Sequence, residues 1–211
     1  MLLWLFFFLA ARRLTLIGTQ FSTLRSQLSE RNRQLTLSLA RIQELASHDD
    51  LTGAFNRRHF MELLLDERER SHRTRQPYSV ALFDLDHFKA INDRHGHAAG
   101  DAVLRDFCTL MQAHMRVTDR FARWGGEEFV LLMPVTTPVE SASLAVERIR
   151  GAVAAHDWST TTTLAADERV TVSAGVATSV AGESVEALIA RADAALYQAK
   201  DGGRNRYVMA A

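Results

Sequence analysis

Cysteine and lysine are scarce in this sequence, and it carries no net charge. Cys108 is the single cysteine among 211 residues, which excludes an intramolecular disulfide and favours a reducing compartment. The 25 basic residues balance 25 acidic ones, whereas a protein that binds nucleic acid over a whole face is expected to be basic. We therefore expect a domain of ordinary globular composition that has no nucleic-acid partner.

The sequence also lacks an apolar run long enough to cross a membrane. Residues 1–11 are uncharged but Arg12 and Arg13 follow, and a spanning helix needs about 20 apolar residues. A basic beginning and a cleavage site, as in a secretory signal, are missing too. Residues 1–17 are consistent with the end of a membrane helix, with a short apolar anchor, or with a helix end that packs on a partner. Six arginines and two glutamates give residues 1–48 a charge of +4, which suits the cytoplasmic flank of a membrane.

Lysine is almost replaced by arginine, which accounts for 23 of the 25 basic residues; the two exceptions are Lys89 and Lys200. Lysine presents a compact, rotatable charge, whereas arginine presents a rigid fork. In a chain that otherwise uses arginine, these two lysines are candidates for positions where the difference matters.

Residues 18–48 predict one long helix with a narrow apolar seam. Alternating steps of three and four residues define the seam, in which six of eight residues are apolar: Phe21, Leu24, Leu28, Arg31, Leu35, Ser38, Ile42 and Leu45. This spacing is typical of a parallel coiled coil, which would join two chains. The alternative is an amphipathic helix that lies on its own domain.

From residue 49 onward the pattern predicts an α/β fold, with helices packed on a mixed central sheet. The predicted helices are 57–72, 87–95, 100–114, 138–156 and 184–200. The predicted strands are 78–85, 120–124, 129–133, 170–176 and 206–208, with a polar loop or edge segment at 160–163. Gly125 and Gly126 mark the turn of a hairpin, and Pro138 suits the first position of a helix.

Acidic residues occur at two points where such a fold can present them to a ligand. Asp84 and Asp86 end an apolar strand, at a rim where the sheet meets solvent, and Glu127 and Glu128 follow two glycines in the hairpin turn. Carboxylates from two such places can hold Mg²⁺, which prefers oxygen ligands and substrate phosphates. A pair of metal ions can stabilise the attacking and leaving oxygens of phosphoryl transfer. Alternatively, each acid is simply solvated.

A series of motifs resembles, in order and spacing, those of the GGDEF family of diguanylate cyclases. They are DLTGAFNRR at 50–58, FDLDHFK at 83–89, NDRHGHAAGD at 92–101, RWGGEEF at 123–129, VSAGV at 172–176, ADAALYQAK at 192–200 and GRNR at 203–206. The fourth is the GGEEF form of the signature. The resemblance implies a catalytic domain at 49–211 with the palm-like fold of nucleotide cyclases and polymerases, preceded by a long N-terminal helix. It also implies condensation of two GTP into cyclic di-GMP.

The resemblance assigns a role to each site residue. Asp84, Glu127 and Glu128 would be catalytic and, with the carbonyl of Leu85, would hold a pair of Mg²⁺ ions, for which Mn²⁺ could substitute. Asn92 and Asp101 would recognise guanine, because buried polar groups left unpaired by another base discriminate strongly. The residues that would hold the triphosphate are His87, Phe88, Lys89, Lys200 and Arg204.

Regulation and assembly are implied as well. Arg116-Val-Thr-Asp119 resembles the family's inhibitory RxxD site for cyclic di-GMP, and Arg148 would add a contact. Because each domain would bind one GTP, two must face each other, so a homodimer joined by the helix 18–48 is expected. The catalytic domain would be in the cytoplasm, anchored at the bacterial inner membrane if residues 1–17 contact lipid.

Two other functions remain open. A non-catalytic receptor for GTP or cyclic di-GMP is the first, although such a receptor would have lost carboxylates that are all present here. In the second, residues 1–48 are the main functional part and the domain serves as an adaptor. The remaining candidates are expected to be structural: His95 and His97 lack a third ligand for zinc, and the residues expected in the core are Phe83, Cys108, Trp124 and Phe129.

Overall fold

The computed structural model describes residues 4, 25–38, 47–135 and 140–210, which belong to two units, 1–46 and 47–211. In the first unit residues 25–38 are helical and exposed, and the rest of the apolar seam and nearly all of residues 1–17 lie outside the described residues. The predicted helix does not extend to residue 48, because His48 pairs with Phe55 in a β-bridge. No helix within the described ranges combines the length and the apolar character that crossing a membrane requires.

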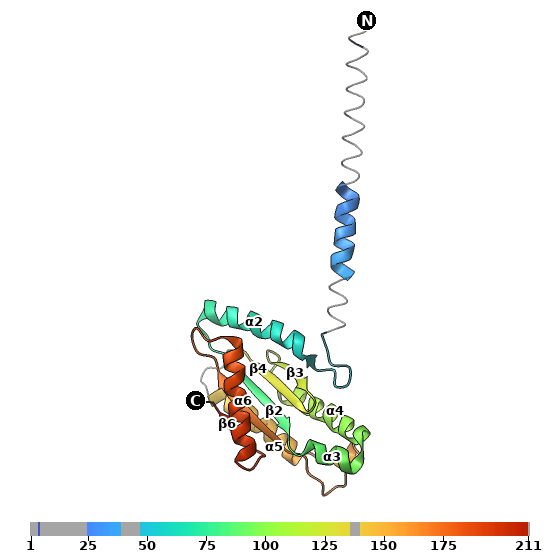
Figure 1. Ribbon diagram of the computed structural model, residues 1–211, viewed down its shortest axis with the longest axis vertical. Helices are drawn as coiled ribbons and strands as arrows, with labels where there is room; N and C mark the ends of the chain where they lie inside the picture. The colour runs from blue at the N-terminus through green and yellow to red at the C-terminus, as the bar shows by residue number, and fades with distance from the viewer. Residues whose placement is uncertain (1–3, 5–24, 39–46, 136–139, 211) are drawn as a thin grey trace. The chain divides into compact units, whose positions relative to one another are not determined.

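The second unit contains a single mixed sheet with helices on it, which confirms the predicted fold class (Figure 1). Its helices are α2 (Arg57–Thr74), α3 (Phe88–His95), α4 (His97–His114), α5 (Glu140–Ala155) and α6 (Val185–Asp201). Its strands are β1 (Phe55–Asn56), β2 (Ser79–Leu85), β3 (Arg120–Gly125), β4 (Glu128–Met133), β5 (Val172–Thr178) and β6 (Tyr207–Met209). The six strands lie in the order β1-β3-β4-β2-β5-β6, with β2 antiparallel to both of its neighbours.

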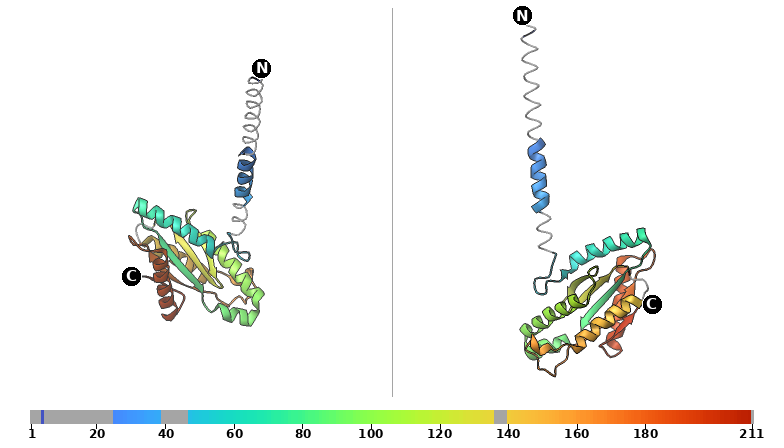
Figure 2. Two further views of the ribbon diagram at one scale, coloured as in Figure 1. Left: turned by 45° about the horizontal axis from the view of Figure 1, so that its top comes forward. Right: turned by 180° about the vertical axis from the view of Figure 1, so that it is seen from behind.

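Both faces of the sheet are covered, so its central strand is apolar on both sides. Helices α2 and α6 pack on one face, and α3, α4 and α5 on the other (Figure 2). Successive side chains of a strand point to opposite faces: Val80 and Leu82 belong to the cluster under α2 and α6, whereas Ala81 and Phe83 belong to the other. All seven residues of β2 are buried, which leaves polar function to the end of the strand.

Some helices and strands begin or end at residues other than the predicted ones. Helix α4 begins at His97 and contains Gly100 in its first turn, because Gly96, with φ of 82°, already separates it from α3. Strand β5 is two residues later than predicted. The segment predicted as a polar loop begins within a 3₁₀ turn, Trp158–Thr160, whose tryptophan is buried. Pro138 lies outside the described residues.

The expected core residues are confirmed with one exception. Phe83, Phe129 and Cys108 are buried in one apolar cluster, and burial raises the pKa of the cysteine thiol to about 12. Trp124 is only half-buried: it packs against the other apolar cluster, and the guanidinium of Arg57 lies over its ring, 4.4 Å from the centroid.

Candidate active site

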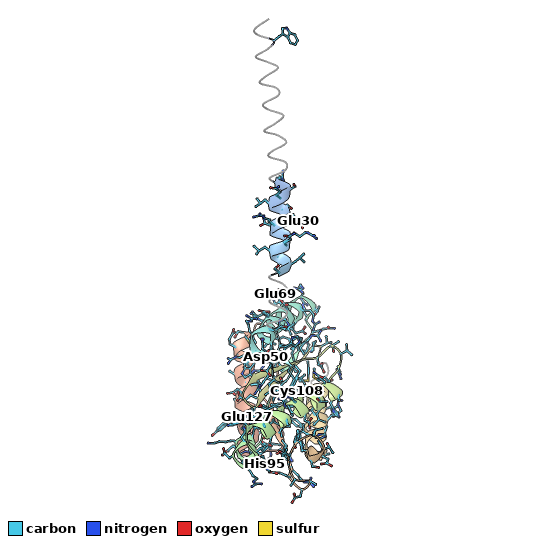
Figure 3. The ribbon with its side chains drawn as sticks, turned by 90° about the vertical axis from the view of Figure 1, so that its right-hand side faces the viewer. Glu30, Asp50, Glu69, His95, Cys108 and Glu127 are labelled. Carbon is cyan, nitrogen blue, oxygen red and sulfur yellow. The ribbon has the colours of Figure 1, made fainter. Side chains whose placement is uncertain are left out.

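Strand β2 and the β3–β4 hairpin bring the three predicted catalytic acids to one end of the sheet. Asp84 and Glu128 are directly opposite each other in the antiparallel pair β2–β4. The N–H of Leu85 donates a hydrogen bond to the carbonyl of Glu127, at 3.4 Å. The hairpin turns at Gly126, whose φ of 51° favours glycine. Figure 3 shows Glu127 in the half of the domain that lies away from Glu69 of α2.

These acids disfavour one another's ionised forms. Burial raises the pKa of Asp84 and so do the charges of Glu127 and Asp86, although a 2.7 Å ion pair with Lys200 opposes the rise. Burial also raises the pKa of Glu128, and the charge of Asp84 adds to the effect. The site therefore holds more negative charge than its one directly bonded cation, Lys200, neutralises.

A divalent cation fits this donor set. All the donors are oxygens, which hard cations such as Mg²⁺ prefer, and a bound cation would relieve the repulsion between the carboxylates. The residues that could hold it are Asp84, Glu127 and Glu128, with the Leu85 carbonyl. Within the described ranges, no three acidic, histidine or cysteine side chains are already gathered as closely as a metal site requires. Lys200 provides the positive charge beside Asp84 instead.

Asp86, the second acid at the end of β2, is not available to bind a ligand, because its carboxylate is bonded within the domain. The carboxylate of Asp86 accepts hydrogen bonds from Thr171 Oγ1 at 2.7 Å, Ser173 Oγ at 2.7 Å and the N–H of Asn205 at 3.0 Å. The expectation that both strand-end acids are at a solvated rim is wrong, because Asp84 is only 8% exposed and Asp86 only 4%. Strand β5 and the loop before β6 supply the donors that cover Asp86.

The predicted triphosphate residues surround the same end of the sheet. Strand β2 leads into α3 through His87, whose φ of 57° is left-handed, so the free N–H groups of the helix begin close to Asp84. Phe88 is buried at the first position of α3 and Lys89 is exposed beside it. Lys200, near the end of α6, reaches Asp84. Arg204, the fifth predicted residue, is exposed in the loop that follows, next to the residue bonded to Asp86.

The two predicted guanine-binding residues are brought together where α3 packs on α4. A Cβ added to Gly100 would lie 1.9 Å from Oδ1 of Asn92 and 3.0 Å from Cζ of Phe88. The Asn92 amide therefore occupies the space over Gly100, and Asp101 is the next residue along α4. Glycine at position 100 permits this close packing, which explains why a glycine is tolerated within the first turn of a helix.

The predicted inhibitory residues also lie together, in the turn after α4. The main-chain N–H of Arg116 donates to the carboxylate of Asp119 at 2.8 Å, and Arg148 reaches across from α5 to the carbonyl of His114, also at 2.8 Å. Burial raises the pKa of Asp119, and the charges of Arg116 and Arg148 act against that rise. The guanidinium of Arg116 is exposed, so the turn presents positive charge to solvent.

Asp193 and Tyr197 of α6 were not singled out from the sequence. The charge of Asp193 contributes to the raised pKa of Glu128, which puts this residue beside the acids. Tyr197 is 71% exposed one turn later, on the face that continues to Lys200. Asp193 lies four residues before Tyr197, which lies three residues before Lys200. This helical spacing is the feature of the sequence that could have indicated them.

His95, noted in the sequence together with His97, has a structural partner. Its Nε2 atom lies 2.8 Å from the carboxylate of Glu168, which also accepts a hydrogen bond from Arg94 at 3.1 Å. These contacts join the end of α3 to the loop before β5.

Comparisons with known proteins assign the catalytic unit to a family. The profile of the family described as "Diguanylate cyclase, GGDEF domain" matches residues 46–206. Diguanylate cyclase DgcM of Escherichia coli K12 is 41% identical over 169 residues, covering 80% of this chain and 40% of DgcM. The response regulator PleD of Caulobacter vibrioides is 44% identical over 169 residues, covering 78% of this chain and 36% of PleD. The chain thus spans about two fifths of the length of these relatives.

A solved structure gives the same result for the fold. The coiled coil and GGDEF domain of DgcB from Caulobacter crescentus, in complex with c-di-GMP, matches with a TM-score of 0.77 and 32% identity, over 89% of this chain and 99% of that structure. The family profile, the identity to curated relatives and the shared mixed sheet all concern the region that holds the acidic cluster. This chain therefore belongs to the GGDEF family of diguanylate cyclase domains.

Proposed function

We propose that this chain condenses two molecules of GTP into cyclic di-GMP and releases two molecules of pyrophosphate. The observation that carries the proposal is the juxtaposition of Asp84 and Glu128 across β2–β4, with Glu127 in the adjoining turn and Lys200 bonded to Asp84. Carboxylates and a lysine ammonium group at the end of the sheet suit the binding of a metal-complexed triphosphate. Similarity to the diguanylate cyclase DgcM supports the same chemistry.

In the proposed reaction, the 3′-oxygen of each GTP forms a bond to the α-phosphorus of the other, and at each phosphorus the bond to pyrophosphate breaks. Bound divalent cations would supply charge stabilisation for the phosphoryl transfer. Glu128, whose pKa is raised by burial and by the charge of Asp84, accepts the proton of the 3′-hydroxyl at a carboxylate oxygen. Asp84, Glu127 and the Leu85 carbonyl would hold the cations.

The other residues bind and orient the substrate. Lys89, Lys200 and Arg204 offset the charge of the β- and γ-phosphates, and the free N–H groups at the start of α3 bind the same anion. Asn92 and Asp101 hydrogen-bond the edge of guanine, which excludes adenine because its donors and acceptors are arranged differently. GTP as substrate implies a cytoplasmic catalytic domain, and membrane contact through residues 1–17 stays a prediction.

The function is tested by incubating the full chain with GTP and Mg²⁺ and separating the nucleotides by chromatography. The control is the double variant Glu127→Gln/Glu128→Gln, which keeps the shape of the turn and removes two charges. Cyclic di-GMP from the wild type alone would support the proposal. Bound GTP without any product would instead favour a receptor. If Arg116 and Asp119 bind product, the wild-type progress curve should stall early and that of Arg116→Ala should not.

Two catalytic domains, each with one bound GTP, must be held together for the reaction. The helix at residues 25–38 has exposed leucines through which two chains could pair. Leu28 and Leu35 are each 60% exposed and stand seven residues apart, the repeat of a coiled coil. Ile42, the next residue of the predicted seam, lies outside the described residues. Burying such leucines against a second copy would contribute about 1.5–3 kcal/mol for each side chain.

We expect Leu28→Gln with Leu35→Gln to lower the dimer fraction and reduce the activity per chain at nanomolar enzyme by about tenfold or more. Sedimentation and product formation should change together, and activity should recover at high protein concentration. Leu37→Gln is the matched control, because Leu37 is 58% exposed on the same helix but lies outside the seam. A double variant with unchanged dimer mass would contradict a dimer joined by this helix.

A further inference from the structure

Asp86 is a buried acid that the proposed chemistry does not use. It is 4% exposed, and its carboxylate accepts three hydrogen bonds, from two hydroxyl groups and one main-chain N–H. In return, the N–H of Asp86 donates to the carbonyl of Thr171 at 2.9 Å. Burying a carboxylate costs free energy unless hydrogen-bond donors surround it. The three donors around Asp86 therefore indicate that this carboxylate connects the segments that supply them.

One of the three donors belongs to the loop between α6 and β6. Asn205, whose N–H lies 3.0 Å from Oδ2 of Asp86, and the preceding Arg204 both have left-handed backbone conformations, with φ of 46° and 63°. Arginine has no side-chain bond that favours this region, so the conformation costs about 1 kcal/mol or more and must be held by its surroundings.

Several hydrogen bonds hold this loop among the described residues, and one joins it to β5, where the N–H of Ala174 donates to the carbonyl of Arg206 at 2.9 Å. The N–H of Arg204 donates to the carbonyl of Ala199 at 3.1 Å, which only continues the end of α6. Arg150 of α5 donates to the side-chain oxygen of Asn205 at 2.7 Å. Asp86 alone connects the loop to the strand that carries Asp84, two residues away. Asp86 bonds to the residue that directly follows Arg204, so it contributes to the direction of the exposed Arg204 side chain relative to the acidic cluster.

We infer that Asp86 is a positioning residue, which holds Arg204 where it meets the triphosphate of GTP; this inference rests on the proposed function. Asp86 itself does not touch the substrate. The two neighbouring carboxylates thus act differently: Asp84, in β2, acts through its charge, whereas Asp86, just after β2, acts through the position of its acceptor oxygens.

The substitution Asp86→Asn distinguishes these two roles. An asparagine at position 86 can be oriented so that its single oxygen accepts from the N–H of Asn205 and from Thr171. Its amide nitrogen can then donate to Ser173, because a hydroxyl group can accept a hydrogen bond as well as donate one. Asparagine thus preserves the anchor and removes the charge. Alanine removes both. A role in positioning predicts that asparagine rescues what alanine loses, and a role as metal ligand predicts that it does not.

The experiment measures kcat and KM for GTP, with Mg²⁺ in excess, for the full chain and for Asp86→Ala, Asp86→Asn, Arg204→Ala and the double variant Asp86→Ala/Arg204→Ala. We expect Asp86→Ala and Arg204→Ala each to raise KM about tenfold, with a smaller effect on kcat. The double variant should be no worse than either single one, because both remove the same contact. Asp86→Asn should stay within about twofold of the wild type.

If Asp86→Ala does not fold, Asp86→Ser replaces it, because a serine hydroxyl can bond to Thr171 or Ser173 but is too short to reach Asn205. Ser173→Ala is the control that removes one hydrogen bond of Asp86 and leaves the loop anchor in place. Additive effects in the double variant, or an Asp86→Asn variant as impaired as Asp86→Ala, would overturn the inference. A wild-type chain that binds no GTP would refute the proposed function and the inference together, whereas a wild type that forms product isolates the inference.

Discussion

Replacing Gly175 by alanine is expected to lower the free energy of unfolding of the catalytic unit by about 3 kcal/mol or more. Helix α6 lies directly on β5 at this residue. An added Cβ would be 2.0 Å from the carbonyl oxygen of Ala192 and 2.2 Å from the nitrogen of Leu196. These atoms are the acceptor and donor of one hydrogen bond of the helix, so no side-chain rotation can relieve the clash. The helix would have to move away from the sheet.

Thermal and urea unfolding measure the effect. In a domain of this size each kcal/mol shifts Tm by about 2–4 °C, so a fall of about 6–12 °C is expected. Gly151→Ala is the matched control, because Gly151 lies within α5 and a Cβ there would meet no atom within 4 Å. That variant should gain up to about 1 kcal/mol, since alanine favours helix over glycine. Equal Tm values for the two variants would contradict the contact between α6 and β5.

The sequence predicted the elements around Gly175 better than it predicted their contact. Apolar runs and helical periodicity are local properties, and they predicted the five helices and five of the six strands of the described catalytic unit. Strand β1 has only two residues and carries no periodic signal. The strand order, with β2 between β4 and β5, depends on pairing between residues about 50 to 100 apart, which no local pattern encodes. The motif VSAGV contributed to the resemblance without revealing that its glycine lies against α6.

In the candidate site too, the residues could be predicted from the sequence, whereas several of their contacts could not. Asp84 and Glu128 are 44 residues apart. Their places at a strand end and in a hairpin turn suggested a shared cation, and the family resemblance assigned their roles, but neither predicted that they are directly opposite each other in β2–β4. The burial of Asp86 could not be predicted, because its donors come from β5 and from the loop before β6. Family likeness assigned Lys200 to the triphosphate, and it did not suggest the ion pair with Asp84. Contacts of this kind depend on where the ends of several elements meet.

The ion pair between Lys200 and Asp84 is relevant to a second prediction with a large expected effect, the substitution of Asp84. We expect Asp84→Asn to reduce product formation by about 10³-fold or more, because it removes a charge that a bound cation requires. In the absence of divalent ions, the same variant should be at least as stable as the wild type. Burial, together with the charges of Glu127 and Asp86, raises the pKa of Asp84 above its ordinary value of 3.8. The folded chain therefore holds this proton more tightly than the unfolded chain does.

The sign of the stability effect follows from this difference in proton binding. Where the folded state binds more protons than the unfolded state, stability falls as pH rises, so the contribution of Asp84 falls as pH rises above 3.8 toward its folded pKa. Above its folded pKa the ionised Asp84 is destabilising, and asparagine of the same shape avoids this cost. Lys200 loses its partner in the variant, but its side chain is 32% exposed and can be hydrated. Function and stability should thus change in opposite directions, as at other sites that hold excess charge.

Thermal unfolding with and without Mg²⁺ and GTP, alongside the chromatographic assay, tests both parts. The ligands should raise the Tm of the wild type and leave that of Asp84→Asn nearly unchanged, because only a chain that binds them is stabilised. Asp66→Asn, an exposed acid of α2, should behave as the wild type. Retained activity in Asp84→Asn would remove Asp84 from the chemistry. Lost activity together with a lower Tm in metal-free buffer would instead make Asp84 chiefly the structural partner of Lys200, and the metal would then have to depend on Glu127 and Glu128.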